Sequence, residues 1–114
     1  MAEKYSTRKL GRYTVIDASG ELGFSESQVL KGEVLKLIEK RAKNLIVNLS
    51  PVTLLGSIGL SVIIKLWDIT VTGGGDFRVI CSNAHIRDVF AVTGTDRKIP
   101  IYIQESDLVK DVKV

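Results

Sequence analysis

The sequence is poor in the residues that build disulfide frameworks and metal sites. Its 114 residues include one cysteine, Cys81, and one histidine, His85. A lone cysteine cannot form a disulfide within the chain, and one Cys with one His four positions later matches no spacing of a metal site. We therefore expect no bound metal, and no organic cofactor is implied.

Long apolar runs are also missing. No segment approaches the roughly 20 consecutive apolar residues of a membrane-spanning helix. The first six residues, from Met1 to Ser6, contain no apolar core of a signal peptide. The sequence therefore predicts a cytoplasmic protein that does not insert into a membrane.

The signature motifs of common enzyme classes are absent as well. There is no phosphate-binding loop, dinucleotide-binding glycine motif, nucleophile elbow or pair of acids at a strand end. Three consecutive glycines, 73–75, follow a predicted helix instead of preceding one, so we expect them to end that helix and not to hold a phosphate. His85 is expected on the surface and Cys81 in the core. These features predict a binding protein and not an enzyme.

Charge does not single out a nucleic-acid partner. The net charge of +3 comes from Lys and Arg residues spread along the chain, with acidic residues between them. The densest basic cluster is Lys36, Lys40, Arg41 and Lys43. We interpret it as the solvated end of a helix, where cations complement the helix dipole, because base-stacking aromatic residues are not interleaved there. No direct contact with nucleic acid is expected.

The composition is that of a packed globular domain, with 45% hydrophobic and 25% charged residues. A chain of this length is sufficient for one domain and too short for two, so residues 1–114 are expected to form a single domain. Residues 5–9 and 12–18 are rich in extended-chain formers and predict an antiparallel pair of strands.

A helix is predicted next. The segment Ser25-Glu26-Ser27-Gln28 has a capping-box pattern, and apolar residues then recur at helical spacing as far as Ile38. We expect this helix to continue to about Lys43. Residues 45–49 are a short apolar run, which is typical of a central strand covered on both faces.

The second half alternates helices and strands. After a loop, helical spacing of Leu60, Ile63, Ile64, Trp67 and Val71 predicts a helix over 57–72. A strand at 77–81, a helix capped by Asn83 and ended by Gly94, a strand at 99–103 and a closing helix at 105–112 follow. This order favours parallel pairing of the last three strands. The fold class is therefore α/β, with a mixed sheet of about five strands and about four helices.

The most distinctive segment is residues 48–60, where a buried strand leads through a short loop into a helix that begins near Ser57. One interpretation is purely structural: Ser57 caps the helix, and the glycines at 56 and 59 permit a tight entry. The other is that Ser57 is the centre of a functional site.

This segment resembles the signature of STAS domains of the anti-sigma-factor-antagonist type. In that family a strand ending in D-L-S leads to D-S-S/T-G-L at a helix start. Here the corresponding residues are Asn48-Leu49-Ser50 and Gly56-Ser57-Ile58-Gly59-Leu60. The similarity extends to Gly20-Glu21-Leu22 and, near the end of the chain, to residues 93–102.

The resemblance implies a partner-switching role. In such proteins an anti-sigma factor with serine kinase activity phosphorylates the serine at the position of Ser57, and the unphosphorylated form binds that kinase so that a sigma factor is released. The partner-binding residues implied are Gly56, Ser57, Ile58, Gly59 and Leu60. Three positions depart from the family pattern: Gly56 and Asn48 replace aspartates, and Ile58 replaces a second Ser or Thr.

Two alternatives remain beside this hypothesis. The three positions that differ from the family pattern favour a STAS scaffold that is not phosphorylated. Such a scaffold would be a subunit of a signalling complex or a membrane transport system. A nucleotide-binding protein is disfavoured, because no acid that could hold magnesium lies beside a phosphate loop. A monomer is expected, with a dimer through the N-terminal edge strand as the alternative.

Overall fold

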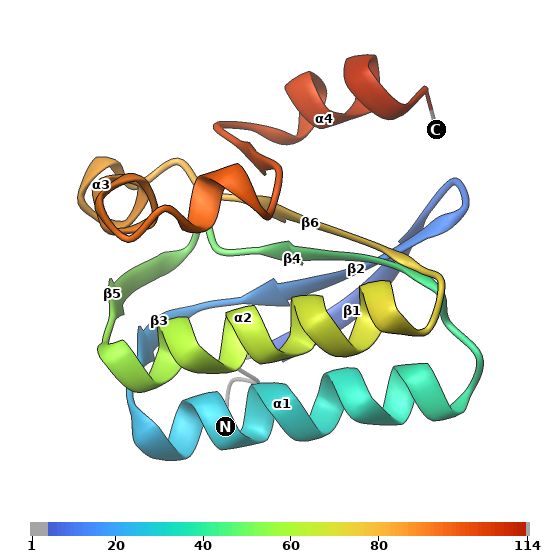
Figure 1. The fold of residues 1–114 in the computed structure, drawn as a ribbon, viewed down its shortest axis with the longest axis horizontal. Helices are drawn as coiled ribbons and strands as arrows, with labels where there is room; N and C mark the ends of the chain where they lie inside the picture. Colours follow the sequence, from blue (N-terminus) through green and yellow to red (C-terminus); the bar gives the residue numbers. More distant parts are fainter. Residues whose placement is uncertain (1–4, 114) are drawn as a thin grey trace.

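The computed structural model describes residues 5–113 and contains a mixed five-stranded sheet (Figure 1). In spatial order its strands are β1 (Tyr5–Leu10), β2 (Tyr13–Ala18), β4 (Asn44–Asn48), β6 (Asp76–Ile80) and β7 (Ile101–Tyr102). The first pair is antiparallel and the other neighbouring pairs are parallel. The predicted pairings and the α/β fold class are confirmed.

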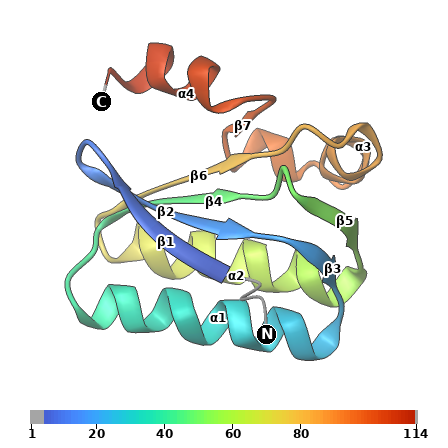
Figure 2. The ribbon, with the colours of Figure 1, turned by 180° about the vertical axis from the view of Figure 1, so that it is seen from behind.

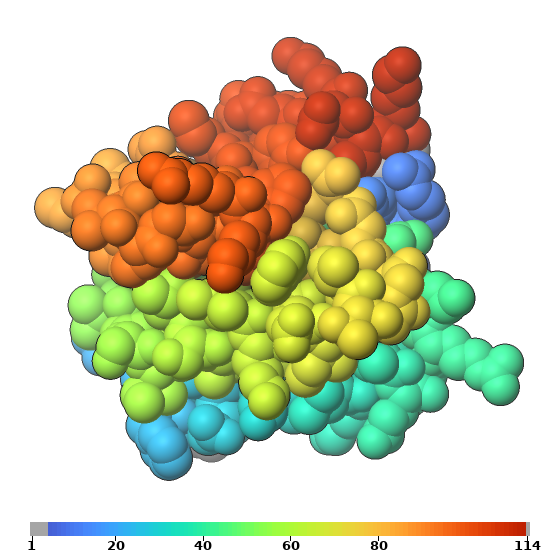
Figure 3. All heavy atoms as spheres, viewed as in Figure 1, coloured from blue at the N-terminus to red at the C-terminus, as the bar shows by residue number. Residues whose placement is uncertain are grey.

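Helices cover both faces of this sheet. Helices α1 (Phe24–Glu39) and α2 (Ser57–Thr72) lie side by side on one face and run in the same direction, and α4 (Glu105–Val112) lies on the other (Figures 1 and 2). Helix α3 (Ala84–Val92) follows the carboxyl end of β6. In the space-filling view, α2 forms a broad band of the surface between α1 and α3 (Figure 3).

The side chains of the central strand β4 point alternately into two buried cores, which explains why its sequence is apolar without interruption. Leu45 and Val47 of β4 point into the main core beneath α1 and α2, whereas Ile46 points into a smaller core beneath α4. All three side chains are fully buried. A strand that is covered on both faces needs apolar residues at every position, so this prediction is confirmed.

A second, two-stranded sheet was not predicted. Strand β3 (Gly20–Leu22) pairs in parallel with β5 (Val52–Leu55), and the two strands lead toward α1 and α2. The expectation of a plain loop before α2 was therefore wrong. In β5 the first and last residues are buried and the middle two are exposed, so the alternating pattern by which a strand is recognised is missing.

Both predicted ends of the first helix were wrong. The N-cap residue of α1 is Gly23, which offers no side-chain acceptor, and Ser27 is fully buried inside the first turn, so no capping box forms. At the other end the helix stops at Glu39 because Arg41 adopts a left-handed conformation (φ 69°) and turns the chain away.

The predicted apolar stripe of α2 was only partly correct. The buried residues are Gly59, Val62, Ile63, Leu66 and Thr70, whereas Val71 is 44% exposed. This helix carries apolar residues around most of its circumference, so periodicity alone did not identify the face that meets the sheet.

The boundaries of the helices after β5 agree more closely with the prediction. Gly73 caps α2, and the Asn83 side chain accepts hydrogen bonds from the backbone N–H groups of His85 and Ile86 at 2.9 and 3.2 Å. Gly94 follows α3 with φ 76°, as expected of a helix stop. The last strand is shorter than predicted, because residues 95–97 form a 3-10 turn and Ile99 bonds back to Thr95.

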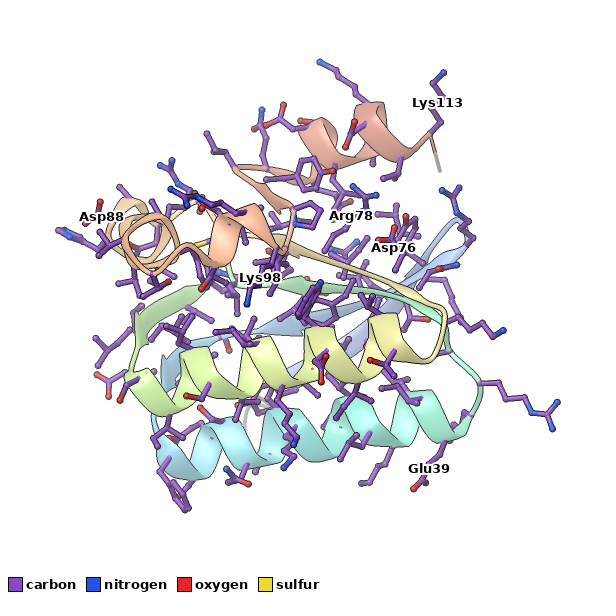
Figure 4. All side chains as sticks on the ribbon, viewed as in Figure 1. Glu39, Asp76, Arg78, Asp88, Lys98 and Lys113 are labelled. Carbon is purple, nitrogen blue, oxygen red and sulfur yellow. The ribbon has the colours of Figure 1, made fainter. Side chains whose placement is uncertain are left out.

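Polar contacts fasten α4 to the sheet at two places. Arg8 of β1 bridges Asp17 of β2 and Glu105 at the start of α4, with N···O distances of 2.7 and 2.6 Å. Near the end of α4, Asp111 accepts hydrogen bonds from Arg78 and Tyr102, and Arg78 also pairs with Asp76 (labelled in Figure 4). These contacts supplement the small apolar core beneath the helix.

Asn48 belongs to the first of these networks. Its Nδ2 donates to Asp17 Oδ1 at 2.7 Å, and its Oδ1 accepts from the Ser50 N–H at 3.1 Å. The Arg8 guanidinium lowers the pKa of Asp17, so this carboxyl is charged over most of the pH range. An amide at position 48 therefore satisfies a charged neighbour that a second carboxylate would repel.

We predict that Asn48→Asp destabilises the fold near neutral pH by about 1–3 kcal/mol, because the new carboxylate would face Asp17 without a proton between them. Like charges raise the folded-state pKa of one of the two groups, so the loss should shrink as the pH falls toward about 4. Urea unfolding at several pH values measures this. Asn48→Ala is the control, whose loss should not diminish in acid, and equal stability of Asn48→Asp and wild type at neutral pH would contradict the prediction.

A second prediction concerns the close approach of Gly75 to the start of β4. A Cβ atom built on Gly75 would lie 2.0 Å from the Lys43 carbonyl oxygen and 3.1 Å from Thr70 Cγ2. We expect Gly75→Ala to cost about 1–3 kcal/mol of stability, measured by thermal or urea unfolding. Gly32→Ala, where the new Cβ meets no atom within 4 Å on α1, should instead stabilise by up to about 1 kcal/mol. A neutral Gly75→Ala would refute the close contact.

Candidate functional site

The segment after β4 brings Ser57 to one end of the molecule. The chain passes through β5 and enters α2 at Ser57, next to the start of α1 (Figure 1). The Gly56 N–H donates to the Leu22 carbonyl at 3.4 Å, which ties the entry to β3. Two short strands and two helix starts therefore meet at this end.

Ser57 is exposed and its hydroxyl is free. It is the first residue of α2, and within residues 5–113 no hydrogen bond is made by its side chain. The N-cap position is occupied by Gly56, which has extended geometry (φ −80°, ψ 175°) and makes no side-chain cap. The structural interpretation in which Ser57 caps the helix was wrong, because the serine lies one position too late in the chain.

The two glycines beside Ser57 have different roles. A Cβ on Gly59 would lie 2.6 Å from Leu55 Cδ1 and 3.1 Å from the Leu22 carbonyl oxygen, so only glycine lets α2 approach β3 and β5 this closely. A Cβ on Gly56 would meet only the Leu22 oxygen, at an ordinary 3.8 Å. The expected tight entry is confirmed at Gly59, while Gly56 has room for a side chain.

The structure places the predicted partner-binding residues at different depths. Gly56 and Ser57 are exposed, Ile58 is 43% exposed, Leu60 is half-buried against the core, and Gly59 is buried. Gly59 can therefore act only by positioning its neighbours.

Sequence analysis missed two apolar side chains at this end of the molecule. Leu54 of β5 is 56% exposed and Phe24 at the start of α1 is 66% exposed. Both belong to elements that meet the beginning of α2, since β5 leads into it and α1 packs along it. Little in the sequence pointed to either residue. Phe24 lies just before the periodic pattern of the first helix, and Leu54 lies in the segment that was expected to be a loop.

The electrostatics of this helix start favour an anion. No acidic residue lies in the first turn of α2, and Gly56 supplies no acceptor to the free N–H groups there. The positive end of the helix dipole is therefore left without a side-chain counter-charge. In the described part of the chain, Ser57 makes no hydrogen bond to an acid or His85 that could activate it.

The other residues singled out from the sequence lie elsewhere. His85 is exposed at the second position of α3, as predicted. Cys81 is fully buried, and burial raises the pKa of its thiol, so it is a core residue as expected. Across residues 5–113, no group of three or more His, Cys, Asp or Glu side chains is placed to hold a metal ion. None of the helices described there is long and apolar enough to span a membrane.

Comparison with solved structures identifies similar folds over nearly the whole chain. An anti-sigma factor antagonist from Mycobacterium paratuberculosis is 23% identical with a TM-score of 0.86, covering 96% of this chain and 93% of that one. The Bacillus cell fate determinant SpoIIAA in its phosphorylated form is 17% identical with a TM-score of 0.74, covering 95% and 98%. A STAS-domain anti-sigma-factor antagonist from Planctomyces limnophilus is 18% identical with a TM-score of 0.79, covering 94% and 95%.

A search of the curated proteins gives no match. The family model of the STAS domain matches residues 4–108, which include all seven strands and the first three α-helices of the described structure. Nearly the whole chain is thus accounted for by one family, and this protein belongs to the STAS domain family.

Proposed function

We propose that this protein is an anti-sigma-factor antagonist, which binds an anti-sigma factor with serine kinase activity and thereby releases a sigma factor. The whole chain, residues 1–114, would act as one cytoplasmic, monomeric, non-catalytic module that regulates transcription in a bacterium. Phosphorylation of Ser57 would switch it off. The observation that carries the proposal is the exposed Ser57 hydroxyl at the start of α2, which has no partner among residues 5–113.

The chemistry of this position supports a phosphorylation switch. A kinase can reach an exposed hydroxyl at a helix start without unfolding the chain. The product phosphate would face free N–H groups and the positive end of the α2 dipole, and the first turn of α2 holds no acidic residue. The modified state would therefore be tolerated by the fold.

The neighbouring apolar residues support a protein partner. Ile58, Leu54 and Phe24 are each at least 43% exposed around the serine-bearing end of the molecule. A partner that covers such side chains must also cover Ser57, and a phosphate of about −1.5 to −2 charge would then be desolvated at the interface. Modification would release the partner without a change of fold.

Our first functional prediction is that Ser57 carries a phosphoryl group in the native host under one growth condition and not under another. Intact-mass measurement of the purified protein would show the added mass, and Ser57→Ala would abolish it. Wild type should capture a kinase-like anti-sigma factor in a pull-down, and Ser57→Asp should lose it because the added charge opposes the contact.

Ser61→Ala is the matched control for this experiment. Ser61 is also an exposed serine of α2, one turn later, and its hydroxyl donates to the Ser57 carbonyl at 3.0 Å. This variant should keep both the modification and the partner. Reproducible capture of a partner that is not a kinase, with Ser57 unmodified in every condition, would refute the proposal.

A second functional prediction concerns Gly56, which stands where the family pattern has Asp. Gly56→Asp would restore the family signature, and its Cβ has room beside the Leu22 oxygen. The carboxylate could accept from first-turn N–H groups of α2, so we expect stabilisation of about 0.3–1 kcal/mol in urea unfolding. Gly56→Ala has the same backbone restriction without an acceptor and should not share this gain. Equal stability of the two variants would show that no cap forms.

A second candidate function follows from the same departures. Gly56 and Ile58 stand where the family pattern has Asp and Ser or Thr. A STAS scaffold subunit of a signalling complex or membrane transport system would need the apolar end surface but no phosphorylation. Stable residence in a large assembly, with Ser57 never modified, would support this function over the switch.

A further inference from the structure

Strand β7 forms one edge of the five-stranded sheet, and among residues 5–113 no strand lies on its outer side. On its inner side, the Pro100 carbonyl accepts from the Val79 N–H at 3.0 Å. The Tyr102 carbonyl accepts from the Cys81 N–H at 2.7 Å. Backbone groups of successive strand residues point to opposite sides, so Ile101 directs its N–H and carbonyl outward, where the described chain offers them no partner.

The residues of this edge are apolar, unlike those of the opposite edge. Natural edge strands are commonly protected by charged side chains. Strand β1 contains Arg8 and Lys9, whereas the residues of β7 and the one after it are isoleucine, tyrosine and isoleucine. Ile103 is 52% exposed, and the backbone of Gln104 is also extended (φ −145°, ψ 160°). Of the two edges, β7 is the one that suits an apolar strand.

A hollow of about 570 Å³ lies between this edge and α3. Ile101 and Ile103 form one wall, and the fully buried Phe90 also contributes to the lining. The other wall is one face of α3, at helical spacing: Ala84, Arg87, Asp88 and Ala91. Its two alanines leave room beside β7. A strand added to β7 would direct every second side chain into this hollow.

The exposed charge in the lining is negative. Asp88 and Asp96 are both exposed, and neither side chain makes an ion pair or hydrogen bond within residues 5–113. Asp88 lies on the outer side of α3 (Figure 4). The one cation of the lining, Arg87, is half-buried, and its Nε is shielded from solvent. These charges favour a basic segment over an acidic one.

We propose that the α3–β7 groove, formed by this hollow and the free edge of β7, binds an extended segment of a partner protein. The segment has apolar side chains at alternate central positions and lysine or arginine at its ends. Hydrogen bonds to Ile101 supply affinity, and the hollow selects the side chains. A second copy of this chain fits less well, because its Asp88 and Asp96 would approach those of the first. The groove shares no residue with 56–60, and the inference is independent of the proposed function.

The test is a titration of the full-length protein with the capped peptide Lys-Lys-Val-Thr-Val-Lys-Lys, followed by amide NMR shifts. We expect saturable shifts in residues 84–91 and 101–104. Two N-methylated versions probe the edge, one methylated at the valines and the other at the threonine and its neighbouring lysines. Because alternate N–H groups of an added strand face β7, one version should bind about fivefold or more weakly and the other like the parent. A peptide with glutamate in place of lysine should bind more weakly than the parent.

Variants of α3 test the hollow itself. Ala91→Trp should abolish saturable binding, because the indole fills the space beside β7. Val92→Trp is the matched control, since Val92 is 79% exposed on the same helix and lies outside the lining. It should bind like wild type, and both variants should keep the melting temperature because both positions are exposed.

Several results would overturn the inference. It fails if the peptide does not saturate, if the two N-methylated versions bind alike, or if Ala91→Trp binds as well as Val92→Trp. Shifts that map to the β1 edge at 5–10, or to residues 56–60, would place the peptide elsewhere. Shifts at 101–104 on dilution of the protein without peptide would show a second copy in the groove instead of a partner segment.

Discussion

The close seating of α2 is the constraint on which the rest of the structure depends. At one end, Gly59 lets the helix approach Leu55 and the Leu22 carbonyl, where a Cβ would lie 2.6 and 3.1 Å from these groups. At the other end, Gly75 passes the Lys43 carbonyl so closely that a Cβ would lie 2.0 Å away. These contacts position α2 against the β3–β5 pair and against the start of β4. The apolar side chains between them belong to the main core.

The packing of α2 against its neighbours also determines how Ser57 is exposed. Because the glycines at 56 and 59 flank the serine, the backbone is tied down while the hydroxyl stays in solvent. The helix start has no acidic residue and no side-chain cap, so its positive end is available to an added phosphate. The proposed switch would change charge and not conformation, which suits a helix whose buried face cannot move without opening cavities. The free serine and the exposed Ile58 are thus consequences of one packing arrangement.

The opposite end of the same two helices has a different electrostatic character. There α1 ends in a Schellman turn at Arg41, and Lys40 and Arg41 line a hollow together with Lys9 of β1. The cluster at 40–43 is already dense in the sequence, and the fold adds Lys9 to it because the first hairpin meets this helix end. The molecule therefore has an apolar, serine-bearing end and a basic end, separated by the length of α2 (Figure 2).

The sequence by itself determined the class of the fold and most of its elements. The apolar run at 45–49, the capping Asn83 and the glycine stops after α2 and α3 are local signals, and each was confirmed because its cause is local. The position of Ser57 at a helix start was also predictable from its flanking glycines.

Only the tertiary structure decided the rest. The buried face of α2, the β3–β5 pair, the exposure of Phe24 and Leu54 and the gathering of Lys9 with Arg41 depend on partners distant in sequence. Periodicity reports how residues repeat along one element, whereas burial and charge density depend on which other elements lie against it.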